Sequence, residues 1–213
     1  KMKPKILITR KISDEAEKKI KKNFTVSLNH NDEPIKYKKL IELCNKHDGA
    51  IVTAWDKLDK NFFNSINGKL KIISTIAAGY DNIDLIEAKK KKIKITNAPN
   101  LQNDAVAETT ILLMLASARR AYEGVSMVKG KKWNKTKIDH TKFMVGKSMT
   151  GKNLGIIGMG RIGRVVALRA KAFEMKIFYH NRSKLNKKIE NGAKYFKSLK
   201  TMLSQSDFVS IHT

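Results

Sequence analysis

The sequence is poor in the features that mark secreted and membrane proteins. Cys44 is the only cysteine among 213 residues, so neither an internal disulfide nor a cysteine zinc cage can form. This absence favours a reducing compartment. No apolar run reaches the ~18 residues of a membrane span, and residues 1–4 lack the apolar core of a signal peptide. We therefore expect a cytoplasmic protein without a membrane-embedded part.

Acidic residues are also scarce: 19 Asp and Glu stand against 44 Lys and Arg, which gives a formal net charge of +25. Only seven of the basic residues are arginine, the residue best suited to bidentate contacts with phosphate. Lysine runs at 18–22 and 89–92 fall on the polar flanks of expected helices. The composition favours a solvated lysine-rich surface, so nucleic acid is not an expected partner, with anionic substrates as a further explanation of the charge.

The composition is otherwise that of a globular protein, with 41% hydrophobic and 30% charged residues, and the length suffices for one large domain or two small ones. In the first hundred residues, short β-branched runs alternate with polar helical stretches, as in a parallel sheet with crossover helices. Leu40, Ile41 and Cys44 share one helical face, which predicts Cys44 to be a core residue. The expected strands are 5–9, 24–28, 49–53, 70–76 and 93–96, and the expected helices are 14–22 and 37–46.

The turn residues Asn97-Ala98-Pro99-Asn100 predict a boundary between a domain at 1–98 and another at 99–213. The helix expected at 105–122 is apolar on more than one face, so we expect it to be buried on several sides, between two domains or two subunits. A polar, irregular arm is expected at 124–149. Beyond it the alternation returns, with strands expected at 154–157, 176–180 and 208–212 and helices at 161–173 and 199–204.

A glycine-rich loop gives the strongest local signal. The apolar run 154–157 leads into Gly158-x-Gly160-x-x-Gly163, and apolar residues then recur on one helical face. Gly158 would allow a tight turn, Gly160 the approach of a pyrophosphate to the backbone, and Gly163 close packing of helix on strand. Free amides at a helix start attract phosphate. The pattern predicts a dinucleotide site, with a purely structural glycine turn as the alternative.

The next expected strand decides between the two nicotinamide dinucleotides. An NAD site usually has an acidic residue about 20 residues after the glycines, which binds the adenosine ribose. Here strand 176–180 is followed by Asn181, Arg182, Ser183 and Lys184, and no acid stands at its end. Arg182 can grip a phosphate, Ser183 can donate a hydroxyl and Lys184 adds charge. We expect NADP(H) to be preferred, with NAD(H) possible.

Several motifs occur together in a characteristic order. They are the stretch 73–84 (ISTIAAGYDNID), Asn97-Ala98-Pro99, 104–108 (DAVAE), Arg119-Arg120, Trp133, the glycine loop and Tyr179-His180-Asn181-Arg182. In these motifs, and over almost its whole length, the chain resembles the D-isomer-specific 2-hydroxyacid dehydrogenase family, most of all its glyoxylate/hydroxypyruvate reductase branch.

The resemblance implies an α/β fold with two doubly wound parallel-sheet domains: a flavodoxin-like substrate domain, and a Rossmann-type nucleotide domain that is incomplete here. It implies that the amides of Ala78 and Gly79 hold the substrate carboxylate, with an ordinary strand-to-helix turn as the alternative. Glu108 is expected to be a structural partner rather than an acid catalyst. A homodimer through the nucleotide domain, with an arm around Trp133, is also implied. The cofactor-binding residues carried over by the matching are Asn103, Gly158, Gly160, Arg161, Ile162, Gly163, Asn181, Arg182, Ser183 and Lys184.

The family's catalytic Arg, Glu and His lie in the last third of related proteins, so we expect them beyond Thr213 and none within this chain. The five histidines, His30, His47, His140, His180 and His212, follow neither that pattern nor a metal-site spacing. The expected function is that of a fragment, inactive by itself, of a reductase that uses NAD(P)H to convert glyoxylate or hydroxypyruvate to the D-2-hydroxy acid. Alternatives are a phosphoglycerate-type or lactate-type dehydrogenase, and a nucleotide-responsive, corepressor-like binding protein. Apolar surface is expected at the last strand.

Overall fold

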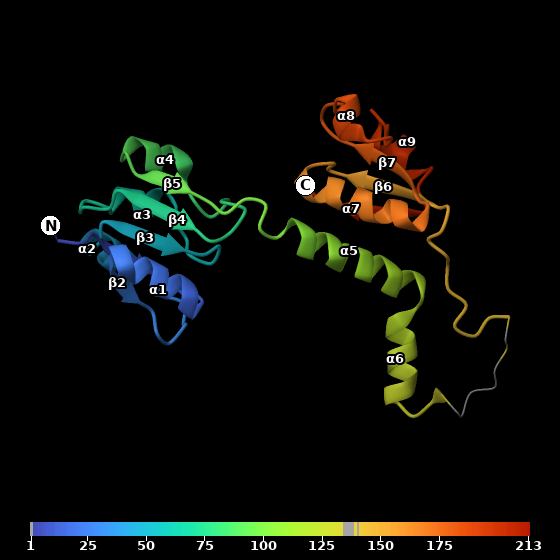
Figure 1. The fold of residues 1–213 in the computed structure, drawn as a ribbon, viewed down its shortest axis with the longest axis horizontal. Helices are drawn as coiled ribbons and strands as arrows, with labels where there is room; N and C mark the ends of the chain where they lie inside the picture. Colours follow the sequence, from blue (N-terminus) through green and yellow to red (C-terminus); the bar gives the residue numbers. More distant parts are fainter. Residues whose placement is uncertain (1, 134–138, 140) are drawn as a thin grey trace. The chain divides into compact units, whose positions relative to one another are not determined.

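The computed structural model describes residues 2–133, 139 and 141–213. The remaining positions in the expected arm, which include His140, lie outside the described residues. The chain divides into two compact units, Lys1–Leu101 and Gln102–Thr213, and each is described by itself (Figure 1). Within the described residues, no helix combines the length and apolar character needed to cross a lipid bilayer.

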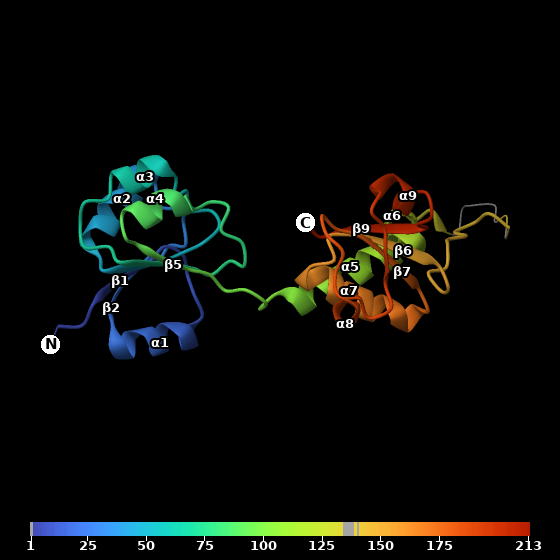
Figure 2. The same ribbon diagram turned by 90° about the horizontal axis from the view of Figure 1, so that it is seen from above.

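Unit 1 contains a five-stranded parallel sheet in the order β2-β1-β3-β4-β5, which is the flavodoxin-like order. Figure 2 shows α1 on one face of this sheet and α2, α3 and α4 on the other. This confirms the predicted fold class for the first half of the chain. The elements are β1 Lys5–Ile8, α1 Asp14–Asn23, β2 Thr25–Leu28, α2 Tyr37–Lys46, β3 Gly49–Val52, α3 Lys60–Asn64, β4 Ile72–Thr75, α4 Leu85–Lys90 and β5 Lys94–Thr96.

The core of unit 1 forms where α2, α3 and α4 cover the sheet. Cys44 is fully buried in it, as predicted, and the adjacent rings of Phe62 and Phe63 meet edge to face at 5.2 Å. His47, in the segment between α2 and β3, is buried. Its ring nitrogens are bonded to the Leu43 carbonyl oxygen and to Ser27 Oγ, and these hydrogen bonds replace those that the ring would make with water.

Two helices of unit 1, α3 and α4, were not anticipated because each is too short to show a helical period. Their starts are nevertheless encoded locally. The Asp59 carboxylate accepts the Phe62 amide at the start of α3, and the Asp84 carboxylate accepts the Ile86 and Glu87 amides at the start of α4. Such caps satisfy amides that a helix itself leaves unpaired.

Unit 2 contains a four-stranded parallel sheet in the order β8-β7-β6-β9, which matches strands 3-2-1-4 of a Rossmann-type domain. Helices α5 and α7 pack together, and Arg169 of α7 pairs with Asp104 and Glu108 of α5. Glu108 is thus an ion-pair partner within the unit. The elements are α5 Asn103–Ala118, α6 Ala121–Lys129, β6 Asn153–Ile157, α7 Arg161–Ala170, the 3₁₀ turn Lys171–Phe173, β7 Lys176–His180, α8 Lys187–Glu190, β8 Lys194–Tyr195, α9 Leu199–Leu203 and β9 Phe208–Ile211.

The prediction of a single helix at 105–122 is wrong, and so is the prediction of a wholly irregular arm from residue 124. Helix α5 ends at Ala118, Arg120 takes a left-handed conformation with φ 55°, and α6 then continues to Lys129. The returning chain causes the break: the Lys147 amide bonds to the Ala118 carbonyl oxygen, and Gly146 packs so closely that a Cβ there would lie 2.3 Å from that oxygen. No proline or glycine marks this break in the sequence.

Within unit 2, α5 is buried on one face, and its burial between two domains or two subunits stays a prediction. Ala107, Met114 and Ala118 are buried on one face of α5, whereas Leu112 and Leu113 are exposed. At the edge of the sheet, Val209 and Ile211 of β9 are exposed as well, which agrees with the apolar surface expected at the last strand.

Replacing Asp59 by Ala should lower the free energy of unfolding of unit 1 by about 1 kcal/mol at neutral pH, because α3 loses its cap. Hydrogen bonds from the Tyr37 hydroxyl and the Phe62 amide lower the pKa of Asp59 from 3.8 to about 2. A carboxylate with a lowered pKa stabilises above its unfolded pKa and ceases to do so as the pH falls through the folded one. The difference between the two chains should therefore shrink from about pH 4 to about pH 2 in urea titrations followed by circular dichroism.

Asp59→Asn is the control for this prediction, since it keeps a capping oxygen but removes the titrating charge. It should cost less stability than Asp59→Ala at neutral pH. An equal loss in both variants, or a loss in Asp59→Ala that is unchanged at acid pH, would contradict the assigned cap.

Candidate functional site

A pocket of about 700 Å³ lies in unit 2 where β6, β7 and β9 end. Parallel strands place their carboxyl ends at one edge of the sheet, and open α/β sheets bind ligands in the crevice beyond that edge. The lining thus comes from four separate segments of the chain. The lining residues are Ile157, Gly158, Gly160, His180, Asn181, Arg182, Ser183, Leu199, His212 and Thr213.

Two glycines of the loop are required by the protein's own backbone. Gly158 has φ 91°, and a Cβ on it would lie 2.4 Å from the His212 carbonyl oxygen. A Cβ on Gly163 would lie 2.4 Å from the Gly158 carbonyl oxygen, so α7 could not approach the loop as closely. Both positions exclude larger residues whether or not a ligand is present.

Gly160 differs from the other two. Its φ of −83° lies outside the left-handed region that favours glycine, and no atom lies within 4 Å of the position that a Cβ would take. No neighbouring atom in the described fold therefore excludes a side chain here, whereas a ligand approaching the backbone would. Because Gly160 is also the N-cap of α7 and makes no side-chain cap, the amides of Arg161 and Ile162 remain available to an anion.

Asn181 connects the glycine loop to the segment that follows β7. The Met159 amide donates to Asn181 Oδ1 at 2.7 Å, and the Tyr195 hydroxyl donates to the Asn181 carbonyl oxygen at 3.3 Å. The family resemblance implies that Asn181 binds the cofactor, but its side-chain oxygen already accepts a hydrogen bond from within the protein. A contact between residues 22 positions apart leaves no signal in the sequence.

The segment after β7 gives the pocket positive charge. Arg182, Ser183 and Lys184 are all exposed, and the first two line the pocket. Lys184 does not line it, and its Nζ lies 4.0 Å from Glu190 Oε1. Neither Asp nor Glu is among the pocket-lining residues in the described part of the chain. The described lining of the pocket therefore includes a cationic side chain and no side-chain carboxylate.

His180 and His212 line the same pocket. The Nδ1 atom of His180 is bonded to the Phe196 carbonyl oxygen, and the Nε2 atom of His212 is bonded to Ser210 Oγ. Burial lowers the pKa of His212 from 6.5, which favours its neutral form. Among the described residues, no cluster of three or more His, Cys, Asp or Glu side chains could bind a metal ion.

The turn that follows β4 in unit 1 holds the two residues expected to bind a carboxylate. Asn97 Nδ2 donates to the Ala78 carbonyl oxygen at 2.7 Å, and Asn82 Nδ2 donates to the carbonyl oxygens of Thr53 and Asp56. No acceptor in the described chain is bonded to the amides of Ala78 or Gly79. The turn is thus fixed through neighbouring carbonyl groups while two adjacent amides stay available.

The remaining expected site residues lie beside the pocket or elsewhere. Arg161, Ile162 and Gly163 form the first turn of α7, directly after the lining residue Gly160. Asn103 begins α5 and does not line the pocket. Ala78 and Gly79 belong to unit 1.

Comparisons with known proteins agree with this geometry. Residues 111–213 match the family model "D-isomer specific 2-hydroxyacid dehydrogenase, NAD binding domain". The chain is 40% identical over 213 residues to a glyoxylate reductase of Thermococcus litoralis, covering 99% of the chain and 64% of that protein. It is 36% identical to a glyoxylate reductase of Pyrococcus horikoshii, covering 98% of the chain and 62% of that protein. The chain thus spans less than two thirds of the length of these relatives.

Solved structures show the same relationship. A D-isomer-specific 2-hydroxyacid dehydrogenase from a Polaromonas species matches with a TM-score of 0.87 and 32% identity, over 98% of this chain and 65% of that one. A glyoxylate reductase from Paecilomyes thermophila matches with a TM-score of 0.83 and 32% identity, over 99% and 65%. An acyclic imino acid reductase solved with NADPH and D-Arg matches with a TM-score of 0.86 and 27% identity, over 98% and 65%. By sequence and fold together, the chain belongs to the D-isomer-specific 2-hydroxyacid dehydrogenase family.

Proposed function

We propose that the intact protein is an NAD(P)H-dependent reductase that converts glyoxylate or hydroxypyruvate to the corresponding hydroxy acid, with D configuration where the product is chiral. The observation that carries the proposal is the pocket in unit 2, where Gly160 leaves space that the fold itself does not use. Residues 1–98 would bind the substrate and residues 99–213 the dinucleotide. The 2-keto acid is suggested by the two glyoxylate reductases at 40% and 36% identity.

The residues of this chain fit a dinucleotide. The amides of Arg161 and Ile162 would receive the pyrophosphate at the positive end of α7, and the absent side chain of Gly160 would let it reach them. A bound nicotinamide cofactor supplies the hydride that reduces the substrate carbonyl. The residues that polarise the carbonyl and supply the proton would lie beyond Thr213. We do not assign this proton transfer to His180 or His212, which line the proposed dinucleotide pocket itself.

We propose further that NADP(H) is preferred to NAD(H). Arg182 can form charge-assisted hydrogen bonds with a 2′-phosphate, and Ser183 beside it can donate a hydroxyl. An acidic residue at this place would repel that phosphate, and none lines the pocket in the described part of the chain. The related imino acid reductase was solved with NADPH.

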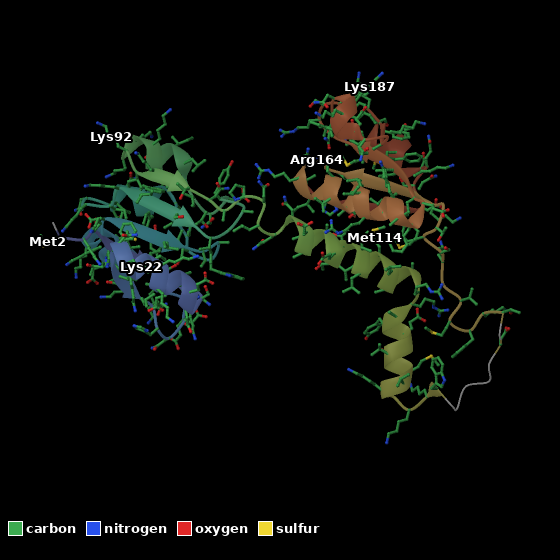
Figure 3. All side chains as sticks on the ribbon, in the orientation of Figure 1. Met2, Lys22, Lys92, Met114, Arg164 and Lys187 are labelled. Carbon is green, nitrogen blue, oxygen red and sulfur yellow. The ribbon has the colours of Figure 1, made fainter. Side chains whose placement is uncertain are left out.

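The amides of Ala78 and Gly79 would hold the carboxylate of the keto acid. Two adjacent amides form a suitable anion site when neither is used by the protein. The net charge of +25 would also favour the approach of an anionic substrate and an anionic cofactor. On the helices of unit 1, the lysine runs around Lys22 and Lys92 lie at the surface (Figure 3), as a solvated lysine-rich surface requires.

A homodimer through the nucleotide domain, in the cytoplasm, completes the proposal. Helix α6 has an exposed apolar stripe of Tyr122, Val125 and Val128, whose spacing puts all three on one face. Next to it, Trp133 and Phe143 pack edge to face at 5.4 Å. A second subunit would cover such a stripe. The single buried cysteine agrees with a reducing compartment.

The intact protein should oxidise NADPH with glyoxylate and with hydroxypyruvate, and more slowly with pyruvate or 3-phosphohydroxypyruvate, in a spectrophotometric assay. The 213-residue chain should bind the cofactor without turnover, because the residues proposed to polarise the carbonyl and to supply the proton lie outside it. Turnover restricted to pyruvate or 3-phosphohydroxypyruvate would replace the proposed substrate. Cofactor-dependent binding of a protein partner without any turnover would favour a corepressor-like role.

Gly160→Ala should weaken dinucleotide binding about tenfold or more, since a methyl group would occupy the path of the pyrophosphate to the amides. It should change the free energy of unfolding by less than about 0.5 kcal/mol, because the Cβ would enter open space. Isothermal titration calorimetry and urea titration measure the two quantities. Gly158→Ala is the contrasting variant: strain at φ 91° should cost about 1–3 kcal/mol of stability. Unchanged binding by Gly160→Ala would argue against the pocket.

Arg182→Ala should reduce NADPH affinity about tenfold to a hundredfold, which corresponds to about 1.4 to 2.7 kcal/mol of charge-assisted hydrogen bonding. NADH affinity should hardly change, because NADH lacks the 2′-phosphate. Arg10→Ala is a matched control that removes one positive charge from unit 1, where Arg10 pairs with Asp32. Equal losses for NADPH and NADH would refute the role assigned to Arg182.

A further inference from the structure

We propose that the buried hydroxyl of Tyr179 determines how strongly the pocket selects a 2′-phosphate, by holding the loop Arg182–Lys184 in its binding conformation. Tyr179 does not line the pocket, so it would be a positioning residue and not a ligand. This inference rests on the proposed function, because it concerns the cofactor preference of the same pocket.

The loop is attached at both ends and is otherwise exposed. At its start, Asn181 is held by the Met159 amide and by the Tyr195 hydroxyl. At its end, the Leu185 amide donates to the Tyr179 hydroxyl at 3.0 Å. The three residues between these attachments, Arg182 to Lys184, are exposed. Their backbone path is therefore set mainly by the two attachments.

Tyr179 can serve as an attachment because its hydroxyl is held from a second side. It donates to Glu190 Oε1 of α8 at 2.6 Å while accepting the Leu185 amide. The ring is fully buried and packs against Tyr195 with a centroid distance of 5.2 Å. Burial, followed by the bond to Glu190, raises the pKa of Tyr179 to about 12, so the hydroxyl keeps its proton and both hydrogen bonds at physiological pH.

The Glu190 carboxylate that accepts the Tyr179 hydroxyl also restrains Lys184. The Nζ atom of Lys184 lies 4.0 Å from the Glu190 oxygen that accepts the Tyr179 proton, so Lys184 and Tyr179 share one buried carboxylate at the end of α8. Without the hydroxyl, the Leu185 amide and the Glu190 carboxylate would each lose a partner, and the loop would sample other conformations. When a loop is in its binding conformation only part of the time, the apparent affinity for its ligand falls in proportion to that fraction.

Binding of 2′,5′-ADP and of 5′-AMP to the 213-residue chain tests the proposal, because these probes differ only in the 2′-phosphate and need no nicotinamide site. In Tyr179→Phe, with the loop competent about a tenth of the time, the Kd of 2′,5′-ADP should rise about tenfold. The Kd of 5′-AMP, which does not contact the phosphate-binding side chains, should change far less. Calorimetry gives both constants.

Tyr37→Phe is the matched control. Tyr37 also donates to a carboxylate, that of Asp59, at 2.5 Å, and its pKa is likewise raised to about 12 by burial and this bond, but it lies in unit 1. Tyr37→Phe removes the same hydroxyl oxygen and should change neither the Kd of 2′,5′-ADP nor that of 5′-AMP. Glu190→Gln should preserve the preference for 2′,5′-ADP, since an amide oxygen can still accept the hydroxyl proton. Hydrogen exchange at the Leu185 amide should become faster in Tyr179→Phe and stay slow in Glu190→Gln.

The outcomes separate this inference from the proposed function. Suppose that the unmodified chain prefers 2′,5′-ADP. If Tyr179→Phe keeps that preference, or weakens the binding of both ligands equally, the positioning role of Tyr179 is overturned while the proposed function stands. If the unmodified chain binds neither ligand, the proposed pocket fails and the inference fails with it. If Tyr179→Phe does not fold, slow exchange at Leu185 and a retained preference in Glu190→Gln support the inference, and fast exchange at Leu185 in the unmodified chain overturns it.

Discussion

The close contact between Gly158 and the end of β9 is the constraint on which the nucleotide unit depends. The Gly158 backbone lies so near the His212 carbonyl oxygen that a side chain cannot fit, and its amide is bonded to the His180 carbonyl oxygen. The turn after β6 is thereby fixed against the ends of both neighbouring strands. A helix that starts from a turn held in this way directs its first amides to one place, which is what an anion site requires.

The three loop glycines illustrate how a single motif combines structural and binding demands. Gly158 and Gly163 are required because backbone atoms lie where their side chains would be. Gly160 is surrounded by open space, so no neighbouring atom excludes a side chain there. A glycine that the fold does not need is better evidence for a ligand than one that it does, and this distinction depends on coordinates, since the three residues are identical in the sequence.

Hydrogen bonds from buried or partly buried side chains position the candidate binding segments in both units. In unit 1, Asn97 and Asn82 hold the turn at Ala78 through carbonyl oxygens. In unit 2, Asn181 and Tyr179 hold the two ends of the loop around Arg182. In both cases the groups left available are exposed amides or cations, while the positioning groups are engaged within the protein. Rigid support of this kind is what a selective site needs.

The sequence by itself determined the parallel α/β class, the strands of unit 1 together with β6, β7 and β9 of unit 2, the core position of Cys44 and the strand–glycine loop–helix unit, because these depend on local period and residue type. Tertiary structure alone decided the break at Arg120, the burial of His47 and the bonding of Asn181 and Tyr179. Each of those depends on a partner brought close by folding: Gly146 and Lys147 for the break, Ser27 for His47, and Met159 and Leu185 for the loop. Such contacts follow from strand order and packing, which a pattern read along one chain does not contain.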